Sequence, residues 1–430
     1  MHEIYDVAII GGGPAGSTAA CLLAKAGRRV VVLEREKFPR FHIGESLLPY
    51  SMPAFDRMGI RETLDSTAQP KHGAEIITAC GTRHLRFHFR DGFKLKHHRS
   101  YQVTRATFDK QLLDNAAAHG AEVREETAVA GVDFDDEGVT VRISSPEAAT
   151  IRARYVIDAS GRQTVIGQQQ RLKQNYPDLN KFAVFAHYDN VRRDPGEDGC
   201  TLTRMIRSRD RWFWVIPLSD TRTSIGLVTD TTTFKAMRLS PEAALEQSFA
   251  EQPHFRDILQ AATRVSPVYT TGDYSYRNTA LVGPRWMLAG DAAGFIDPVF
   301  STGVFLAIAS GEQTADAIHA SLDEPACRHK LFATYEKRMN RVMDLYLRFV
   351  KAWYQHEFIE VISHPTARFQ LPAAVNAVLA GNINGGFSIW WRMQLFYLVV
   401  YLQKFATLCP RLTLIPTPPS SQPASPACAR

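Results

Sequence analysis

The sequence has 430 residues, of which 45% are hydrophobic and 22% are charged. This composition is typical of a globular protein and excludes general disorder. The length exceeds what one small core can organise, so we expect more than one domain. Fifty basic and 44 acidic residues give a net charge of +6, which is too weak to predict nucleic-acid binding.

The cysteine spacing and the absence of a leader pattern predict a cytoplasmic protein. The six cysteines are far apart and include no Cys-x-x-Cys pair, as is typical of isolated thiols in a reducing compartment. The chain runs from its first residues directly into a predicted strand, without a signal-peptide pattern. The most apolar late segment, Leu395–Leu402, has eight residues, which is too short for a transmembrane span. We expect it to form a buried helix face.

The first motif follows a short apolar run, Tyr5–Ile10. Its residues, Gly11-Gly12-Gly13-Pro14-Ala15-Gly16, precede an alanine-rich helical pattern, and a second apolar strand then ends at Glu34. Such glycines let the backbone approach a pyrophosphate at a helix N-terminus, and the acid can accept hydrogen bonds from ribose hydroxyls. The pattern predicts a dinucleotide site and by itself leaves NAD and FAD open.

The chain is organised around Leu281–Gly311. In this segment an apolar run reaches Gly290-Asp291, and Pro298, Ser301 and Gly303 then precede an apolar helical pattern. A strand, a tight turn and a helix start in this order direct backbone N–H groups toward an electron-rich ligand.

Three further segments decide between the two dinucleotides. They are Gly44-Glu45-Ser46, the pair Gln102 and Arg105 before a helical pattern, and Asp158-Ala159-Ser160-Gly161 after a strand. With the glycine motif and Gly290-Asp291, they resemble the FAD-binding half of the para-hydroxybenzoate hydroxylase-like flavoproteins. The resemblance implies FAD, held by Gly11, Gly13, Pro14, Ala15, Gly16, Glu34, Arg35, Arg40, Gly44, Glu45, Ser46, Gln102, Arg105, Asp158, Gly161, Gly290, Asp291, Pro298 and Gly303.

The predicted fold class is α/β. A Rossmann-type FAD-binding domain (residues 1–75, 101–175 and 276–320) is interleaved with a mostly antiparallel β substrate domain (76–100 and 176–275). The second domain is predicted from strand patterns at Lys181–Asp189, Cys200–Ile206, Arg211–Leu218 and Thr223–Thr229. A C-terminal helical region (321–409), which includes a long amphipathic helix over Lys330–Tyr354, precedes a disordered, proline-rich tail (410–430).

The stretch Arg83–His98 predicts a β-hairpin, because Asp91-Gly92 is a strong two-residue turn signal. Its polar face carries Arg86, Arg90 and Lys94. This face is either an ordinary solvated strand face or a docking surface for an acidic partner.

Three features bear on the chemistry. Trp212–Pro217 fits the pattern WxWxIP, Phe295–Gly303 fits FxxPxxSxG, and Lys71 precedes Gly73-Ala74. Each has a plain alternative: an aromatic core strand, a motif shared with related reductases and hydroxylases, or a solvated lysine. Together they resemble the flavin-dependent halogenases, and within them the branch that acts on aryl groups tethered to acyl or peptidyl carrier proteins.

This resemblance implies a mechanism and its residues. FADH2 and O2 oxidise chloride or bromide held near the Ser-x-Gly backbone, and hypohalous acid then travels through a tunnel to the lysine. The implied catalytic residues are Lys71, Trp212, Trp214 and Ser301, the implied halide site is Ser301, Thr302 and Gly303, and no metal is implied. A proton-accepting base is also expected; Glu75 is near Lys71 in sequence, but no residue is assigned to this role.

No second glycine-rich turn follows a strand, so the sequence predicts no nicotinamide-binding unit of its own. Reducing equivalents therefore come from a separate NAD(P)H-dependent flavin reductase or from NAD(P)H that docks transiently. Two other functions stay open. One is an FAD-dependent aromatic hydroxylase or polyprenyl-type reductase, and the other is a catalytically silent flavin-binding partner within a biosynthetic complex.

Overall fold

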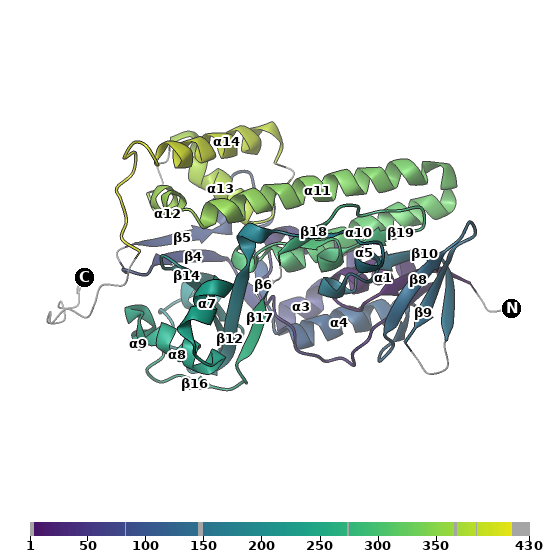
Figure 1. The fold of residues 1–430 in the computed structure, drawn as a ribbon, viewed down its shortest axis with the longest axis horizontal. Helices are drawn as coiled ribbons and strands as arrows, with labels where there is room; N and C mark the ends of the chain where they lie inside the picture. The colour runs from purple at the N-terminus through teal and green to yellow at the C-terminus, as the bar shows by residue number, and fades with distance from the viewer. Residues whose placement is uncertain are drawn as a thin grey trace.

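The computed structural model describes residues 4–81, 83–144, 149–272, 275–364, 368–383 and 385–414. Two large sheets lie end to end, and helices cover them (Figure 1). From residue 415 onward, the tail predicted for residues 410–430 lies outside the described residues.

The first sheet has the strand order β7-β2-β1-β10-β9-β8, with β19 beside β10. Strand β1 (Tyr5–Ile10) pairs in parallel with β2 (Val30–Leu33) and with β10 (Thr150–Asp158). These apolar strands are buried almost throughout, as is typical of parallel strands covered on both faces. The remaining strands are β7 (Glu122–Arg124), β8 (Val129–Phe134), β9 (Val139–Ile143) and β19 (Trp286–Leu288).

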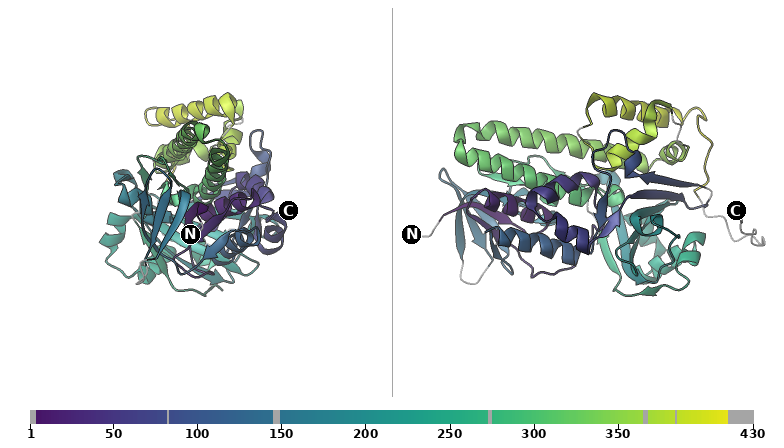
Figure 2. Two further views of the ribbon diagram at one scale, coloured as in Figure 1. Left: turned by 90° about the vertical axis from the view of Figure 1, so that its right-hand side faces the viewer. Right: turned by 180° about the vertical axis from the view of Figure 1, so that it is seen from behind.

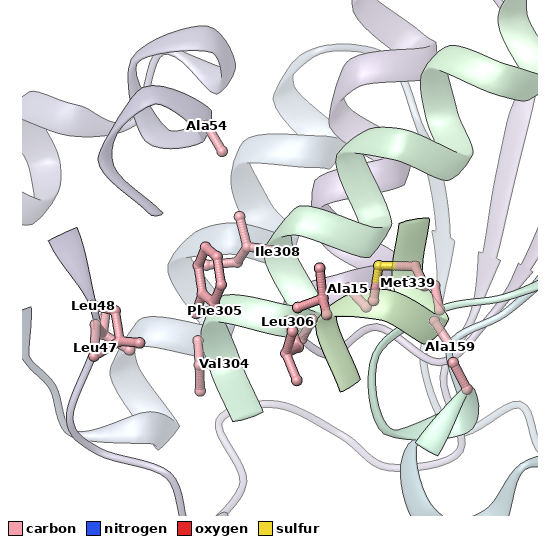
Figure 3. Close-up of a cluster of buried hydrophobic side chains, with 14 of the residues drawn as sticks. Ala15, Leu47, Leu48, Ala54, Ala159, Val304, Phe305, Leu306, Ile308 and Met339 are labelled. Atoms are coloured by element: carbon pink, nitrogen blue, oxygen red, sulfur yellow. The ribbon is translucent and has the colours of Figure 1, made fainter. Parts of the chain in front are cut away.

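Helix α1 (Pro14–Lys25) begins just beyond the carboxyl end of β1 and packs against α4 (Arg105–Ala118) and α10 (Thr302–Asp323). Val304 and Ile308 of α10 belong to the same buried cluster as Ala15 of α1 and Leu48 (Figure 3). The start of α1, at Ala15, therefore packs against the middle of α10, at Gly311.

The second sheet has the order β16-β12-β15-β14-β13-β4-β5, with β17 beside β12. Its pairs are antiparallel except β4–β13. Alternation along β14 directs Trp212 and Trp214 into the main core and Phe213 into a separate core under α8 and α9. Its elements are β4 (Gly73–Thr78), β5 (His84–His88), β12 (Lys181–Asp189), β13 (Leu202–Arg207), β14 (Arg211–Pro217), β15 (Arg222–Asp230), β16 (Thr263–Arg264) and β17 (Tyr269–Gly272), with α7 (Thr231–Met237), α8 (Pro241–Ala250) and α9 (Pro253–Ile258) beside them.

Two smaller sheets connect the large ones. Strand β3 (Gln69–Lys71) pairs with β6 (Ser100–Gln102), and this pair places Lys71 opposite Ser100. The other sheet contains β11 (Lys173–Asn175), β18 (Tyr276–Asn278) and β20 (Gly294–Phe295), and the short helices are α2 (Met52–Met58), α3 (Arg61–Thr67), α5 (Val165–Gln169) and α6 (Asp198–Thr201).

The hairpin predicted around Asp91-Gly92 is wrong. Strand β5 pairs with the preceding strand β4, and a short 3-10 helix, Phe89–Asp91, follows it. The chain then leaves the sheet, because buried Phe89 anchors it and the Phe93 N–H donates to the Ala373 carbonyl, 2.8 Å away in helix α13 (Leu371–Leu379). Packing against the C-terminal helices therefore outweighs the local preference of Asp91-Gly92 for a hairpin turn.

The predicted C-terminal helical region is confirmed. Helix α11 (Arg328–Trp353) matches the long helix expected from the sequence and runs beside α10 (Figures 1 and 2). It is followed by α12 (His356–Ile362), α13 (Leu371–Leu379) and α14 (Gly386–Leu402), and the last two lie near β4 and β5 in Figure 1.

Helix α14 differs from the buried face expected around Leu395–Leu402. It buries Phe396 and Val400, whereas Leu398 and Tyr401 are about half exposed. Among the described residues, no helix is long and apolar enough to cross a membrane.

The α/β class and the C-terminal helices match the predicted architecture. The strands of the first sheet come from residues 5–33, 122–158 and 286–288, and those of the second come from 73–88 and 181–272. The chain thus alternates between the two sheets as expected, and the individual domain boundaries stay a prediction.

Candidate active site

One long cavity lies between the carboxyl edge of the first sheet and the tryptophan face of the second. It extends from Glu34, at the end of β2, to Trp212 and Trp214 on β14. Most of the predicted site residues meet here although they come from distant parts of the sequence. Those that line the cavity are Gly11, Gly13, Pro14, Ala15, Glu34, Arg35, Arg40, Gly44, Glu45, Ser46, Arg105, Gly161, Trp212, Trp214, Gly290, Asp291, Pro298, Ser301 and Gly303.

Five predicted residues, Gly16, Lys71, Gln102, Asp158 and Thr302, are not among those that line the cavity. A Cβ at Gly16 would lie 1.9 Å from the Gly11 carbonyl oxygen, so this position serves close packing. Asp158 accepts hydrogen bonds from the Ser160 and Ile166 N–H groups at 3.0 and 2.7 Å and thereby shapes the loop that does line the cavity. Buried Thr302 is the first residue of α10.

The Glu34 end of the cavity has the features of a pyrophosphate and ribose site. Helix α1 starts here, and its N-cap, Gly13, has no side chain that could cap the first N–H groups. Its first N–H groups therefore face the cavity. The Glu34 carboxylate accepts the Gly12 N–H at 2.7 Å and retains further acceptor capacity toward a hydroxyl.

The loop of residues 40–46 passes along the cavity and is tied to helix α4 and to the second sheet. Arg105 donates to the Ile43 carbonyl at 2.6 Å and forms a two-point ion pair with buried Asp109. At the other end of the loop, the Glu45 carboxylate lies 2.7 Å from the His187 imidazole on β12. The second oxygen of Glu45 is buried and has no hydrogen-bond partner among the described residues, so the loop presents an unsatisfied acceptor beside the cavity.

The start of α10 forms the far wall. Ser301, its N-cap, adopts φ 58° and ψ 28°, a left-handed conformation that is costly for a residue with a Cβ. No side chain caps the helix, so its first N–H groups are open to the cavity. Nearby, burial raises the pKa of Asp291 to about 6, although the charges of Arg105 and Arg162 lower it.

The two tryptophans form one wall because they alternate on the same strand. Their ring centroids are 6.0 Å apart, and the Trp214 indole donates to the Ser224 hydroxyl at 3.1 Å. Gly226, paired with Trp214, leaves space for this ring, since a Cβ there would lie 2.2 Å from it. The cavity face of β13 adds Thr203 and Met205, which sequence reasoning missed even though the alternation of that strand could have indicated them.

Lys71 lies just behind the cavity wall. Its side chain is 2% exposed, and its ammonium group donates to the Leu47 carbonyl at 3.0 Å, one residue beyond the cavity-lining Ser46. Burial lowers the pKa of Lys71 to about 7. Close by on β6, the Ser100 hydroxyl and both polar atoms of the Gln102 amide are buried without hydrogen-bond partners among the described residues.

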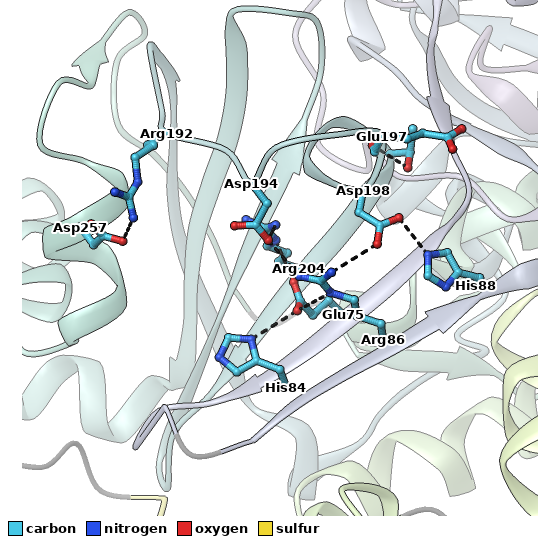
Figure 4. Close-up of polar contacts among 11 residues, drawn as sticks. Glu75, His84, Arg86, His88, Arg192, Asp194, Glu197, Asp198, Arg204 and Asp257 are labelled. Atoms are coloured by element: carbon cyan, nitrogen blue, oxygen red, sulfur yellow. Dashed lines mark hydrogen bonds and ion pairs between the residues drawn. The ribbon is translucent and has the colours of Figure 1, made fainter. Parts of the chain in front are cut away.

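Glu75 is held in a different environment, in a network of ion pairs (Figure 4). Its carboxylate pairs with Arg86 and Arg204, each at 2.9 Å. Burial alone would raise the pKa of Glu75, but hydrogen bonds from His84 and Arg86 and the charge of Arg204 lower it to about 2. So weak a base, committed to two arginines, is a poor proton acceptor. In the same network, the exposed Arg86 guanidinium also pairs with Asp194 and Asp198.

Both the long shape of the cavity and the polar groups that line it fit FAD. An uncapped helix start and an acid stand at one end, and the unsatisfied Glu45 oxygen lies along the cavity. The bulky aromatic wall and the second uncapped helix start stand at the other end. This arrangement suits a ligand with a pyrophosphate near one end and a flat ring at the other.

Comparison with known proteins agrees with this geometry. Residues 4–350 match the model of the FAD binding domain family. The chain is 30% identical, over 89% of its length and 90% of the relative's, to the 1H-pyrrole-2-carbonyl-[peptidyl-carrier protein] chlorinase of Pseudomonas fluorescens. This chain belongs to the flavin-dependent halogenase family.

Two solved structures extend the similarity to nearly the whole fold. The flavin-dependent brominase Bmp2 superposes with a TM-score of 0.83 at 26% identity, covering 94% of this chain and all of that one. A flavoprotein/dehydrogenase from Cytophaga hutchinsonii gives a TM-score of 0.85 at 30% identity, covering 94% and 99% of the two chains. The resemblance found from the sequence motifs is confirmed, and so is the FAD-binding domain.

Proposed function

We propose that this halogenase uses FADH2, O2 and chloride or bromide to replace an aryl C–H hydrogen of a carrier-protein-tethered substrate with a halogen. The observation that carries the proposal is the placement of a buried, readily neutralised amine, Lys71, just behind a cavity that ends in the wall of Trp212 and Trp214. The chlorinase relative, named for a pyrrole on a peptidyl carrier protein, supports the substrate class.

When bound, FAD supplies the electrons that reduce O2 while the halide is oxidised. The chain's own residues hold and separate the reactants. We assign the FAD contacts to the cavity-lining residues given above, with Gly16, Gln102 and Asp158 supporting them from behind. We assign the halide to the start of α10, at Ser301, Thr302 and Gly303, because a helix start stabilises an anion without a buried cation. The Ser301 N–H already donates to the Pro298 carbonyl at 2.9 Å, so the N–H groups of Thr302 and Gly303 are the proposed donors.

Lys71 handles the oxidised halogen. A neutral amine in a dry pocket can hydrogen-bond to an oxidised halogen or carry it covalently. The aromatic wall keeps water and substrate away from the flavin side, which limits loss of the oxidant. The aryl hydrogen leaves as a proton. The polar groups near the amine include the side chains of Ser100 and Gln102, which are buried and have no hydrogen-bond partner among the described residues.

The carrier protein and a separate NAD(P)H-dependent flavin reductase are the proposed partners. Arg90, Lys94 and Lys96 are exposed on the segment that leads from β5 to β6 and contacts α13. On the same segment, the ring of buried Phe89 lies 5.4 Å from the Lys71 ammonium group. An acidic carrier docked on these three cations would present its substrate on the lysine side of the wall.

A second candidate is a hydroxylase or a polyprenyl-type reductase that accepts hydride from NAD(P)H itself. The similarity to a flavoprotein/dehydrogenase supports this second candidate function. It requires neither halide nor Lys71.

The test is an in vitro reaction with a flavin reductase, NADH, O2 and either chloride or bromide. Aryl-loaded carrier proteins and free aryl compounds are offered in parallel, and mass spectrometry reads the halogen isotope pattern. We expect halogenation of a loaded carrier that disappears when halide is omitted. Halide-independent addition of oxygen or reduction of the substrate would support the second candidate instead. Halogenation of free aryl compounds alone would exclude a carrier protein as a partner.

A further inference from the structure

The tryptophan wall is anchored from behind by a chain of two hydrogen bonds. Tyr354, directly after α11, accepts the Trp212 indole N–H at 3.1 Å and donates its hydroxyl proton to the Asp297 carboxylate at 2.6 Å. The three residues come from a C-terminal helix, the central strand β14 and the loop before α10. Trp212 is 2% exposed and Asp297 is fully buried, so both ends of this chain of hydrogen bonds are shielded from water.

The direction of both bonds is fixed by the chemistry of the groups. An indole N–H can only donate, so the Tyr354 oxygen must accept from it. The tyrosine hydroxyl in turn donates its proton to the Asp297 carboxylate. Burial raises the pKa of Asp297 to about 6, against the hydrogen bonds from Tyr354 and Val299 that lower it, and the carboxylate therefore predominates at neutral pH.

The tyrosine ring is held in place on its own account. The Lys181 ammonium group lies 3.8 Å from the ring centroid and also pairs with Asp230 at 2.6 Å. The Arg207 guanidinium lies 5.8 Å from the same centroid. These two cations near its ring help to hold the position of the Tyr354 hydroxyl.

Asp297 connects this chain to the proposed halide site. Its other carboxylate oxygen accepts the Val299 N–H at 3.1 Å and so caps the short turn that leads to Ser301. One buried carboxylate thus holds the turn before α10 and, through Tyr354, the indole of Trp212.

We propose that Tyr354 and Asp297 are positioning residues that fix the Trp212 indole relative to the turn before α10. The catalytic consequence rests on the proposed function: an indole free to tilt would open the wall and let oxidant escape as hydrogen peroxide or hypohalite. Tyr346, on the same helix, provides a matched control. It is buried, but its hydroxyl donates to the Val378 carbonyl at 3.3 Å and does not contact Trp212.

The test compares Tyr354→Phe and Asp297→Asn with Tyr346→Phe. In the apoprotein labelled with ¹⁵N-tryptophan, the Trp212 indole signal is assigned with Trp212→Phe. We expect this signal to shift and its hydrogen exchange to quicken in Tyr354→Phe and Asp297→Asn, but not in Tyr346→Phe. An unmoved Trp212 signal in folded Tyr354→Phe would overturn the positioning role, whether or not the protein halogenates any substrate tested.

The second measurement is the ratio of halogenated product to FADH2 consumed. Loss of one hydrogen bond of ordinary strength predicts that this ratio falls about fivefold in Tyr354→Phe, with released oxidant making up the difference. Equal ratios in Tyr354→Phe and Tyr346→Phe would refute the consequence for catalysis. If the unmodified enzyme gives no halogenated product, the proposed function fails while the spectroscopic result still decides the positioning role.

Discussion

Replacing Lys71 with methionine should stabilise the halogenase at pH 7 and abolish halogenation. In the folded protein, burial lowers the lysine pKa from 10.5 to about 7, whereas the unfolded chain keeps the ordinary value. The unfolded chain therefore binds more protons, and the protein loses stability as the pH falls from about 10.5 to about 7. This difference corresponds to about 4 kcal/mol at pH 7 and about 2 kcal/mol at pH 9.

Methionine fills a similar volume and carries no charge to bury, so Lys71→Met escapes this cost. We expect the variant to be more stable than the unmodified enzyme at pH 7, by an amount reduced by the lost hydrogen bond to the Leu47 carbonyl. The sharper expectation is that its advantage shrinks by about 2 kcal/mol between pH 7 and pH 9.

Urea unfolding of both proteins at the two pH values measures this change, with exposed Lys337→Met as the control that should show none. The same variant should bind FAD normally and yield no halogenated product. A stability difference that is independent of pH would refute the assignment of a buried, readily neutralised amine. Retained halogenation would remove Lys71 from the mechanism.

Three further predictions follow from named contacts. Arg105→Met removes the two-point partner of buried Asp109, which keeps only the Arg40 contact at 3.1 Å, and removes the hydrogen bond to the Ile43 carbonyl, so urea unfolding should show a loss of about 2 kcal/mol and FAD titration a weaker complex; unchanged values would contradict this role. Ser301→Gly relieves the left-handed conformation and should raise the free energy of unfolding by about 1 kcal/mol, with little effect on the KM for halide because the N–H groups remain; a large rise in that KM would instead assign the halide to the hydroxyl. Charge reversal of Arg90 and Lys94 should raise the KM for loaded carrier in a salt-dependent way, and unchanged turnover would place the carrier elsewhere.

The sequence was sufficient for the cofactor end of the site because local rules apply there. A parallel strand, a glycine-rich turn and an acid after the next strand are short-range signals, and Gly13 and Glu34 do line one cavity. The wall was also predictable, because residues two apart on a strand share a face, which places Trp212 and Trp214 together.

The remaining features depend on long-range packing. Nothing local to Asp297 indicates that Tyr354, 57 residues later, will donate to it. The turn signal at Asp91-Gly92 failed because contacts with α13 were stronger than the local preference. Asp158 supports the cavity from behind, because its carboxylate is consumed by two backbone N–H groups of its own loop.

The most direct test of halogenation is a single turnover without nicotinamide. The enzyme is given chemically reduced FAD, an aryl-loaded carrier protein and chloride or bromide, and is then mixed with O2. Because the halide oxidation needs only FADH2 and O2, we predict a halogenated carrier whose isotope pattern follows the halide supplied, and none with Lys71→Met. An oxygenated or reduced product formed without halide, or a strict need for NAD(P)H, would contradict the account.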